Sequence, residues 1–274
     1  MKKALSIFII LVIVATCLST SVSASSSWVS VSIENSRFTG GVVVKDSTTF
    51  VGIRKFATSM YSDAKVTYNY STRTLTVQSS KLYLTATDGK NYIVANGRYL
   101  YTPSPVFMQY GVMYAPVLLM SRAFGASARW NNSTSSFNIT RGSGGILSGS
   151  AFYNEDEVYW LSKIINAESG GEIFKGKLAV GNVILNRVKS SYFPNTIYGV
   201  IFDRKNGTQF SPVANGTIYK APNAESIIAA KICLEGYSID AGILYFVNPA
   251  VAPNSWVAKN RPFYGQIGNH AFFY

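Results

Sequence analysis

The pattern of apolar residues changes at one point in the chain, and this change constrains the fold more than any other feature. Before residues 141–150, short runs alternate apolar and polar residues, as in half-buried strands. After them, apolar residues recur every three or four positions, as in amphipathic helices. Residues 141–150 are rich in Gly and Ser, a composition typical of a flexible linker. We therefore predict a strand-rich α+β domain over 25–140 and a mainly helical domain over 151–274.

The first 24 residues have the order expected of a secretory signal peptide. Lys2 and Lys3 precede a mostly apolar run to Leu18, and small residues follow up to Ala24. The apolar run is shorter than the roughly 20 residues that an uncleaved membrane anchor needs. We therefore expect cleavage after Ala24 and a secreted or wall-located protein.

Positive charge is concentrated in the first predicted domain and the linker. Residues 25–150 contain 12 Lys/Arg and 4 Asp/Glu, whereas residues 151–274 contain 11 and 9. A basic domain outside the membrane would be attracted to anionic wall polymers. The alternative is a generally basic exported protein without specific binding. Export would remove the chain from nucleic acid, so we expect no nucleic-acid partner.

A repeat with a spacing of 62 to 64 residues runs through the first predicted domain. Its two copies each contain a strand, a short helical piece and two further strands: Thr49–Arg54, Ala64–Tyr68 and Thr74–Val77, then Met113–Val117, Ala126–Trp130 and Ser136–Ile139. This pattern resembles the repeat domain named after the N-terminal domain of copper amine oxidases, which accompanies many secreted wall enzymes. The resemblance implies a wall-binding or spacer role. No copper chemistry follows, because residues 25–140 contain no histidine or cysteine.

One carboxyl group continues the apolar stripe of the first helix predicted in the second domain. Val158, Leu161 and Ile165 recur at helical spacing, and the next position on that stripe is Glu168. A carboxyl group on an apolar helix face holds its proton more tightly than in water. Glycosidic cleavage needs such an acid, because the leaving sugar oxygen must receive a proton. If the helix ended before Glu168, the residue would instead be a solvated surface carboxylate.

Motifs around Glu168 extend through the whole second domain. In order they are Ile164–Glu172, Gly176–Val188, Phe193–Ile197, Gly199–Phe202, Gln209–Pro212, Ala229–Lys231, Leu244–Pro249, Trp256 and Ile267–Phe272. This set resembles the cell-wall hydrolase family of spore-cortex-lytic enzymes (the SleB/CwlJ type). The resemblance implies a fold related to lysozyme and resuscitation-promoting factors, with peptidoglycan as the substrate and Glu168 as the catalytic acid. The sequence departs from the family pattern at Gly170 and Val247, and these differences leave substrate preference open.

Two mechanisms of glycan cleavage remain open at this point. The resemblance favours lytic transglycosylation, in which one acid suffices and the product carries a 1,6-anhydro-muramyl end. The alternative is a hydrolytic muramidase, which uses a second carboxylate; its candidates are Glu172, Asp203 and Glu225. A non-catalytic wall-binding protein is the third possibility. The sequence does not separate the vegetative wall from the spore cortex.

Polar and aromatic residues in the matching motifs are the candidate sugar contacts. Sugars bind through hydrogen bonds and flat apolar faces, which these side chains offer. They are Ser169, Gln209, Tyr245, Asn248, Trp256 and His270. If they do not contact sugar, Tyr245 and Trp256 are expected to be core aromatics, and His270 is expected to be a structural histidine. Ser169 either braces Glu168 or caps the following turn.

The supply of metal ligands and nucleophiles argues against other wall-cleaving chemistries. His270 is the only histidine, which is too few for a zinc amidase or peptidase of the HExxH kind. Cys233 lies in an apolar helical pattern, which predicts a buried thiol rather than a catalytic one. No Gly-x-Ser-x-Gly motif is present. We therefore expect no metal or other cofactor, and the glycan strand remains the natural target.

Overall fold

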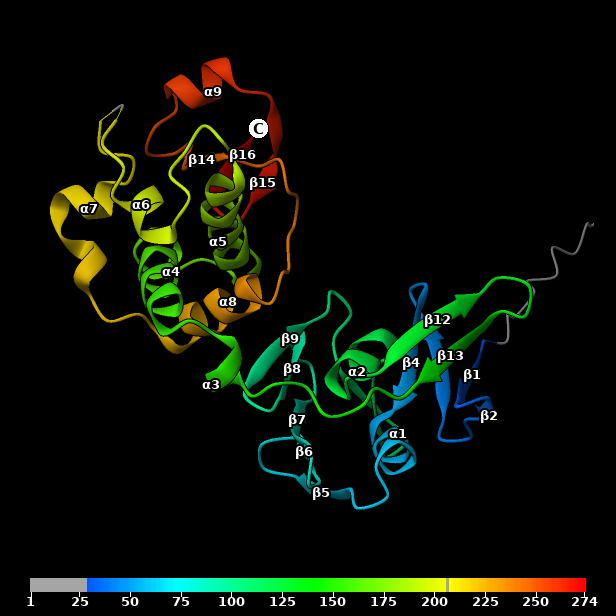
Figure 1. Ribbon diagram of the computed structural model, residues 1–274. Coiled ribbons are helices and arrows are strands. Elements are labelled where there is room, and N and C mark those ends of the chain that lie inside the picture. Colours follow the sequence, from blue (N-terminus) through cyan, green and yellow to red (C-terminus); the bar gives the residue numbers. More distant parts are fainter. Residues whose placement is uncertain (1–28, 206) are drawn as a thin grey trace, which may run out of the picture.

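A computed structural model describes residues 29–205 and 207–274 as two domains (Figure 1). The N-terminal domain consists of strands and two short helices, and the C-terminal domain is mainly helical, so the predicted fold class is confirmed. The expected signal peptide lies outside the described residues. Within the described ranges no helix combines the length and the apolar character needed to cross a membrane.

Three sheets and two helices build the N-terminal domain. The first sheet has the order β12-β13-β1-β2 and contains β1 (Ser30–Ile33), β2 (Ser36–Arg37), β12 (Ser127–Asn131) and β13 (Ser136–Thr140). The second has the order β10-β11-β4-β3 and contains β3 (Val42–Lys45), β4 (Thr48–Gly52), β10 (Phe107–Gln109) and β11 (Val112–Pro116). The third runs in sequence order through β5 (Lys65–Asn69), β6 (Thr74–Gln78), β7 (Tyr83–Thr87), β8 (Tyr92–Ala95) and β9 (Arg98–Tyr101). The helices are α1 (Ile53–Met60) and α2 (Val117–Ala123).

The repeat predicted from the sequence is visible in this architecture. The elements β4-α1-β5-β6 and β11-α2-β12-β13 start 64, 64, 62 and 62 residues apart. The first strands of the two copies, β4 and β11, pair antiparallel. The copies also share one core, in which Phe56 of the first copy and Phe124 of the second meet edge to face at 5.5 Å. Each copy alone would leave this apolar face exposed, so the domain needs both.

Eight helical segments and one small sheet build the C-terminal domain. The helices are α3 (Gly149–Phe152), α4 (Glu155–Ser169), α5 (Phe174–Lys189), α6 (Ile197–Ile201), α7 (Ser211–Asn215), the 3₁₀ helix η1 (Thr217–Tyr219), α8 (Ala224–Leu234) and α9 (Trp256–Asn260). The sheet has the order β14-β16-β15 and contains β14 (Tyr245–Val247), β15 (Phe263–Ile267) and β16 (His270–Phe273).

Helices α4, α5 and α8 pack against one another and form the core of this domain. Gly181 of α5 permits the close approach, because a Cβ atom there would lie 2.8 Å from Cys233 Sγ and 2.9 Å from Ile165 Cδ1. Cys233 is 2% exposed, which confirms the buried thiol predicted from the sequence. Burying one Ile or Leu side chain contributes about 1.5–3 kcal/mol, so this three-helix contact fixes the position of α4.

The ends of α4 are determined by local sequence. Asn154 caps its first turn by accepting hydrogen bonds from the backbone N–H groups of Asp156 and Glu157. The acidic residues of that turn also interact favourably with the positive end of the helix dipole. The helix continues through Glu168 and ends at Ser169, before Gly170 and Gly171. Glu168 therefore lies in the last turn of α4 rather than in a loop.

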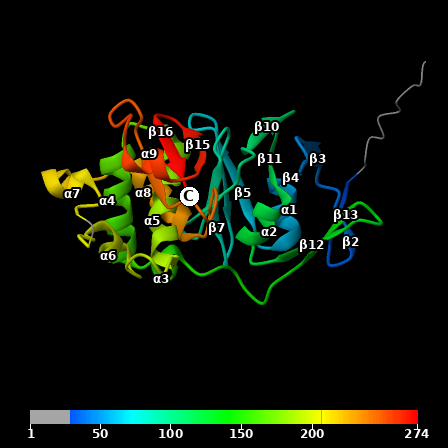
Figure 2. The ribbon, with the colours of Figure 1, turned by 90° about the horizontal axis from the view of Figure 1, so that it is seen from above.

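The two domains meet where β9 lies against α8 (Figure 1; Figure 2 gives the view from above). The rings of Tyr101 and Tyr237 are 4.2 Å apart across this junction. Beside them is a polar group that we call the Glu235 cluster, consisting of the buried Glu235 and Tyr153, the half-buried Arg98 and the exposed Arg122. The Glu235 carboxylate accepts hydrogen bonds from Arg98 Nε (2.8 Å) and Nη2 (2.7 Å), Arg122 Nη2 (2.7 Å) and Tyr153 Oη (2.8 Å).

The segment expected to be a flexible linker makes specific contacts along its length. The Arg141 guanidinium donates to backbone carbonyls of α1, and Asn96 Nδ2 donates to Ile146 O at 3.1 Å. The Gly149 N–H donates to Asn96 O at 2.7 Å, and α3 starts at Gly149, inside the segment. Gly and Ser composition indicates low intrinsic stiffness, but here the N-terminal domain supplies hydrogen-bond partners that hold the segment.

Candidate active site

Glu168 is the carboxyl group whose surroundings best suit acid catalysis. It is half-buried at the end of α4, and no hydrogen bond to its side chain is found within residues 29–205 and 207–274. Burial raises the pKa of Glu168 to about 7, while the nearby positive charge of Arg187 acts in the opposite direction. About half of the Glu168 side chains are therefore protonated at neutral pH. This is the protonation state that a general acid requires.

Arg187 of α5 is the charged residue beside Glu168 that the sequence reasoning missed. It is 5% exposed, and its Nε donates to Leu244 O at 2.8 Å. Its guanidinium lies against three aromatic rings, with centroid distances of 4.7 to 5.3 Å: Phe193, Phe210 and Tyr245. Its Nη1 is buried and has no hydrogen-bond partner in the described part of the chain.

Burial lowers the pKa of Arg187 to about 10, yet the group remains charged at neutral pH. Arg187 thus places a fixed positive charge near Glu168. A signal for it was present in the sequence, because Arg187 follows Val183 and Ile184 at helical spacing on the buried side of α5. That is the same signal that singled out Glu168.

Two of the three candidates for a second carboxylate are engaged elsewhere. Glu172 accepts hydrogen bonds from Asn269 N (3.0 Å) and Nδ2 (2.9 Å), and these bonds lower the pKa of Glu172. This pairing ties the end of α4 to the turn between β15 and β16. Glu225 pairs with the buried Lys177 at 3.0 Å.

Asp203 is the third candidate, and its charge acts on the same arginine as that of Glu168. Its Oδ1 accepts a hydrogen bond from Lys205 N at 2.9 Å, and its negative charge acts on Arg187. It is half-buried. Among the three expected alternatives, Asp203 is therefore the one that shares an electrostatic neighbour with Glu168.

Tyr245 and Trp256 are brought together by a residue that the sequence reasoning did not select. Arg261 Nη2 donates to Tyr245 Oη at 2.9 Å, and its guanidinium lies 4.7 Å from the Tyr245 ring and 5.2 Å from the Trp256 ring. Trp256 is 60% exposed. Trp256 is thus not a core residue, and Tyr245 joins it to the aromatic surroundings of Arg187.

Ser169 and His270 are buried in positions that do not face solvent. Ser169 is 2% exposed and its hydroxyl donates to Ile165 O at 2.7 Å, a bond within α4 rather than to Glu168 or to the following turn. His270 is 6% exposed, and its Nδ1 lies 3.9 Å from Glu172 Oε1. Burial lowers the pKa of His270, which keeps the ring neutral at pH 7. The geometry supports the structural reading of both residues rather than sugar contact.

Gln209 and Asn248 make only local hydrogen bonds. Gln209 Nε2 donates to Gly207 O at 3.2 Å, and Asn248 Oδ1 accepts from Ala250 N at 3.0 Å. Both are half-buried, so part of each amide remains accessible. Gln209 precedes Phe210, whose ring packs on Arg187, whereas Asn248 directly follows β14. Neither is hydrogen-bonded to Glu168 among the described residues.

Both domains match known families. Residues 171–273 match the family described as Cell Wall Hydrolase, and residues 31–139 match the Copper amine oxidase N-terminal domain. The first match starts at Gly171, three residues after Glu168.

Curated relatives match over less than half of this chain. The spore cortex-lytic enzyme of Bacillus cereus is 38% identical over 120 residues, which cover 44% of this chain and 45% of that relative. The enzyme of the same name from Bacillus subtilis is 34% identical over 44% of this chain and 38% of its own length. The cell wall hydrolase CwlJ of Oceanobacillus iheyensis is 27% identical over 44% of this chain and 88% of its own length. The chain thus spans less than half the length of the spore cortex-lytic enzymes it matches.

Solved structures cover a similar share of the chain. The catalytic domain of the germination-specific lytic transglycosylase SleB from Bacillus anthracis is 36% identical, covering 47% of this chain and 100% of that one with a TM-score of 0.41. The catalytic domain of Bacillus cereus SleB is 37% identical, covering 44% and 92% with a TM-score of 0.40. The C-terminal domain of this chain belongs to the cell wall hydrolase family, and its N-terminal domain is of the copper amine oxidase N-terminal type.

Proposed function

We propose that the chain is an enzyme that cleaves peptidoglycan glycan strands between muramyl and glucosaminyl residues, with Glu168 as the catalytic acid. One observation carries this proposal. Glu168 is a half-buried carboxyl group with a pKa of about 7 and no hydrogen-bond donor among the described residues, in a domain of the cell wall hydrolase family. The relatives named spore cortex-lytic enzymes support a wall glycan as the substrate.

The proposed reaction is lytic transglycosylation, in which one carboxyl group serves twice. Glu168 first gives its proton to the glycosidic oxygen, and the bond between that oxygen and the muramyl C1 breaks. The Glu168 carboxylate then accepts the proton of the muramyl 6-hydroxyl while this oxygen bonds to C1. No water is consumed, and the product ends in a 1,6-anhydro ring.

The position of Arg187 suits the second step of this reaction. Once Glu168 has lost its proton, it is an anion in a partly desolvated site, which is unfavourable without a nearby positive charge. The buried guanidinium of Arg187 supplies that charge, and its contacts with Leu244 and three aromatic rings hold it in place. We therefore assign Arg187 as a positioning residue that stabilises the ionised state of Glu168.

The substitution Glu168→Gln tests the assignment, because an amide cannot donate the proton. We expect glycan cleavage to fall by about 10²–10⁴-fold while the fold is retained. Glu157→Gln is the matched control, since Glu157 is an exposed carboxylate on the first turn of the same helix. Cleavage by the Glu168→Gln variant at the rate of the control would show that another group is the acid.

A hydrolytic muramidase is the second candidate reaction, and Asp203 is the observation that favours keeping it. It is half-buried and shares the neighbour Arg187 with Glu168. Digestion in heavy-oxygen water separates the two reactions. Transglycosylation leaves the product ends unlabelled and lighter by one water than hydrolysis products. Label in most product ends, together with loss of cleavage in Asp203→Asn, would establish hydrolysis instead.

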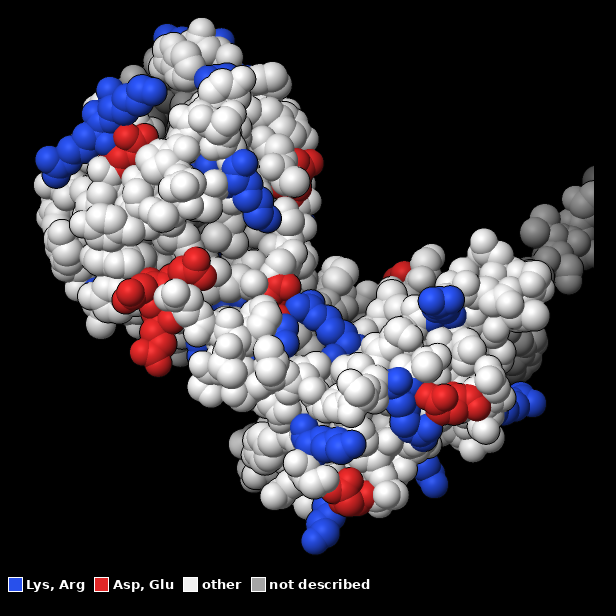
Figure 3. Space-filling view, viewed as in Figure 1, with Lys and Arg blue, Asp and Glu red and all other residues white. Residues whose placement is uncertain are grey.

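We also propose that the chain is exported and acts at the cell wall. The basic, apolar and small residues of the first 24 positions support export. The excess of Lys and Arg in the N-terminal domain supports attraction to anionic wall polymers. On the face shown in Figure 3, these side chains are interspersed with Asp and Glu rather than gathered in one patch. Such an attraction would be weak and diffuse, and it would fall as salt rises.

A further inference from the structure

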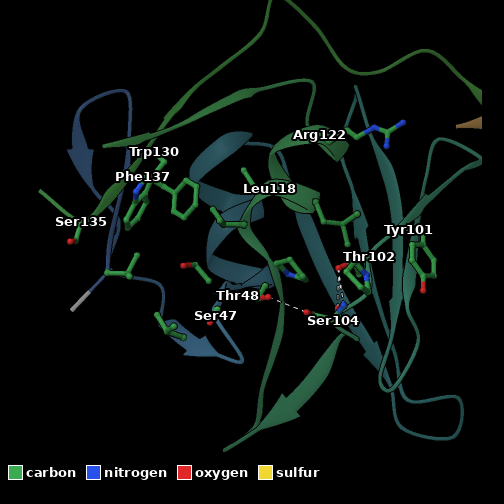
Figure 4. A pocket seen from close by; sticks show the side chains of 17 residues that line it. Ser47, Thr48, Tyr101, Thr102, Ser104, Leu118, Arg122, Trp130, Ser135 and Phe137 are labelled. Atoms are coloured by element: carbon green, nitrogen blue, oxygen red, sulfur yellow. Dashed lines mark hydrogen bonds between the residues drawn. The ribbon is translucent and has the colours of Figure 1, made fainter. Parts of the chain in front are cut away.

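A hollow of about 780 Å³ lies in the N-terminal domain, away from Glu168. We call it the Trp130 trough. Figure 4 shows Trp130 and Phe137 at one end, Leu118 of α2 in the middle and Tyr101 at the other end. Its volume lies within the range of small-molecule sites, about 300–1,000 Å³.

The lining of the trough combines flat apolar surface with hydroxyl groups. Trp130 is 43% exposed and stacks at a tilt on Phe137, with ring centroids 4.8 Å apart. Leu118 is 57% exposed although it lies on a helix that packs into the core. Hydroxyl groups of Ser47, Thr48, Thr102, Ser104 and Ser135 also line the trough. Those of Thr48 and Ser104 are hydrogen-bonded to each other and Thr102 Oγ1 donates to Ser104 O, which leaves Ser47 and Ser135 as the hydroxyls without such a bond among the described residues. An exposed aromatic ring beside hydroxyl groups is the surface that a sugar ring recognises.

The trough offers no free charge. Among the described residues that line it, Arg122 is the only charged one, and the Arg122 guanidinium is already bonded to the Glu235 carboxylate and to Glu235 O. A polyanion would require unpaired Lys or Arg side chains, which this lining lacks. The complementary ligand is therefore neutral and rich in hydroxyl and amide groups.

The trough also borders the junction with the C-terminal domain. Tyr101 lines it and packs on Tyr237, while Arg122 lines it and holds Glu235. The Glu235 cluster fixes the two domains relative to each other. A chain bound in the trough would therefore be held at a defined place beside the catalytic domain.

We propose that the Trp130 trough binds a neutral segment of an N-acetylated glycan strand, at a site separate from the one that cleaves it. The choice of a wall glycan as the natural ligand rests on the proposed function. The site itself rests on the lining of the trough. This binding is distinct from attraction to anionic polymers, because it depends on stacking and hydrogen bonds.

The test uses the full chain and N-acetylglucosamine tetramer as the probe, which lacks the muramyl residue at which the proposed reaction cleaves. We expect the methyl NMR signals of Leu118 to shift on addition of the tetramer. We expect Trp130→Ala to weaken this response about tenfold, and Leu118→Arg to fill the trough and abolish binding there. Tyr110→Ala is the matched control, since Tyr110 is 95% exposed but lies outside the trough. Circular dichroism verifies the fold of each variant.

Salt and a second probe distinguish the other occupants. Tetramer binding at the trough should be unchanged between about 0.05 M and about 0.5 M NaCl, because no free charge is involved. Leu118 shifts caused by inorganic polyphosphate and lost in high salt would overturn the proposal in favour of a polyanion site. Shifts that follow protein concentration alone would overturn it in favour of a second copy of the chain. Tetramer binding unaffected by Trp130→Ala and Leu118→Arg would place sugar binding only in the C-terminal domain. None of these outcomes depends on whether Glu168 is the acid.

Discussion

Two carboxyl groups of the C-terminal domain are withdrawn from water, and their surroundings are opposite. The Glu235 side chain is 1% exposed and accepts four hydrogen bonds from Arg98, Arg122 and Tyr153. Glu168 is half-buried, accepts none from the described residues, and has its pKa raised to about 7. Both lie at the C-terminal end of a helix, where the helix dipole disfavours a negative charge. Helix position therefore does not separate them.

What distinguishes Glu235 from Glu168 is the set of hydrogen-bond partners that each carboxyl group has. A carboxylate bonded to two guanidinium groups and a tyrosine hydroxyl fastens two surfaces together. A carboxyl group without donors retains its proton to higher pH and is available for proton transfer. One residue type thus gives a structural junction in one place and a candidate acid in the other.

The largest expected effect comes from removing the charge of the structural carboxylate. Glu235→Gln leaves the mostly buried guanidinium of Arg98 without its counter-ion, and loss of one partner of a buried pair costs about 3–5 kcal/mol. We expect a loss of this size in the free energy of unfolding, measured with urea, and retained catalysis in the folded fraction. Glu157→Gln, an exposed site, serves as the control. A loss below about 1 kcal/mol would mean that the junction does not depend on this carboxylate.

Removing the charge of Glu168 is expected to have the opposite effect on the free energy of unfolding, which should increase. Glu168 titrates at about 7 in the folded chain, whereas an unfolded Glu titrates near 4.5, so ionising Glu168 within the fold lowers stability as pH rises through this window. Glu168→Gln removes that cost. We expect it to stabilise the chain by about 1–2 kcal/mol at pH 8, after allowance for solvent screening, with little effect at pH 4. Equal stability of variant and wild type at both pH values would contradict the raised pKa.

The smallest effect tests the positive charge beside Glu168. Arg187 lowers the pKa of Glu168 against the larger effect of burial. Arg187→Gln should therefore raise that pKa and move the alkaline limb of the pH–activity profile to higher pH. Arg187→Lys retains the charge and should leave the limb near its wild-type position. An unchanged limb in both variants, with only reduced stability, would make Arg187 a structural residue.

Much of the fold follows from local patterns in the sequence. The alternation of buried residues in β6 and β7, the 62- to 64-residue repeat and the Asn154 cap of α4 are each encoded within a few residues. The helical spacing from Leu161 to Glu168 also predicted that α4 continues to the acid. These features depend on backbone geometry and periodicity, which a single sequence displays.

The residues that the sequence did not reveal depend on contacts between distant segments. Glu235 acquires its partners from β9 and α2, more than 100 residues earlier in the chain. Arg261 joins Tyr245 to Trp256 across the loop after β14. Ser169 and His270 have the types of sugar-binding residues but lie buried. The type of a residue indicates which roles are chemically feasible, whereas the packing of the chain determines which of them the residue can have.

The pKa of Glu168 is the quantity on which the account depends most, and it can be measured directly. The chain is labelled with ¹³C at the Glu side-chain carboxyl groups, and the Glu168 signal is assigned by its absence in Glu168→Gln and followed by NMR from pH 3 to pH 9. We predict a midpoint of about 7, well above the ordinary value of 4.5 for a Glu side chain. A midpoint near 4.5, in common with the exposed carboxylates, would contradict the assignment of Glu168 as the acid.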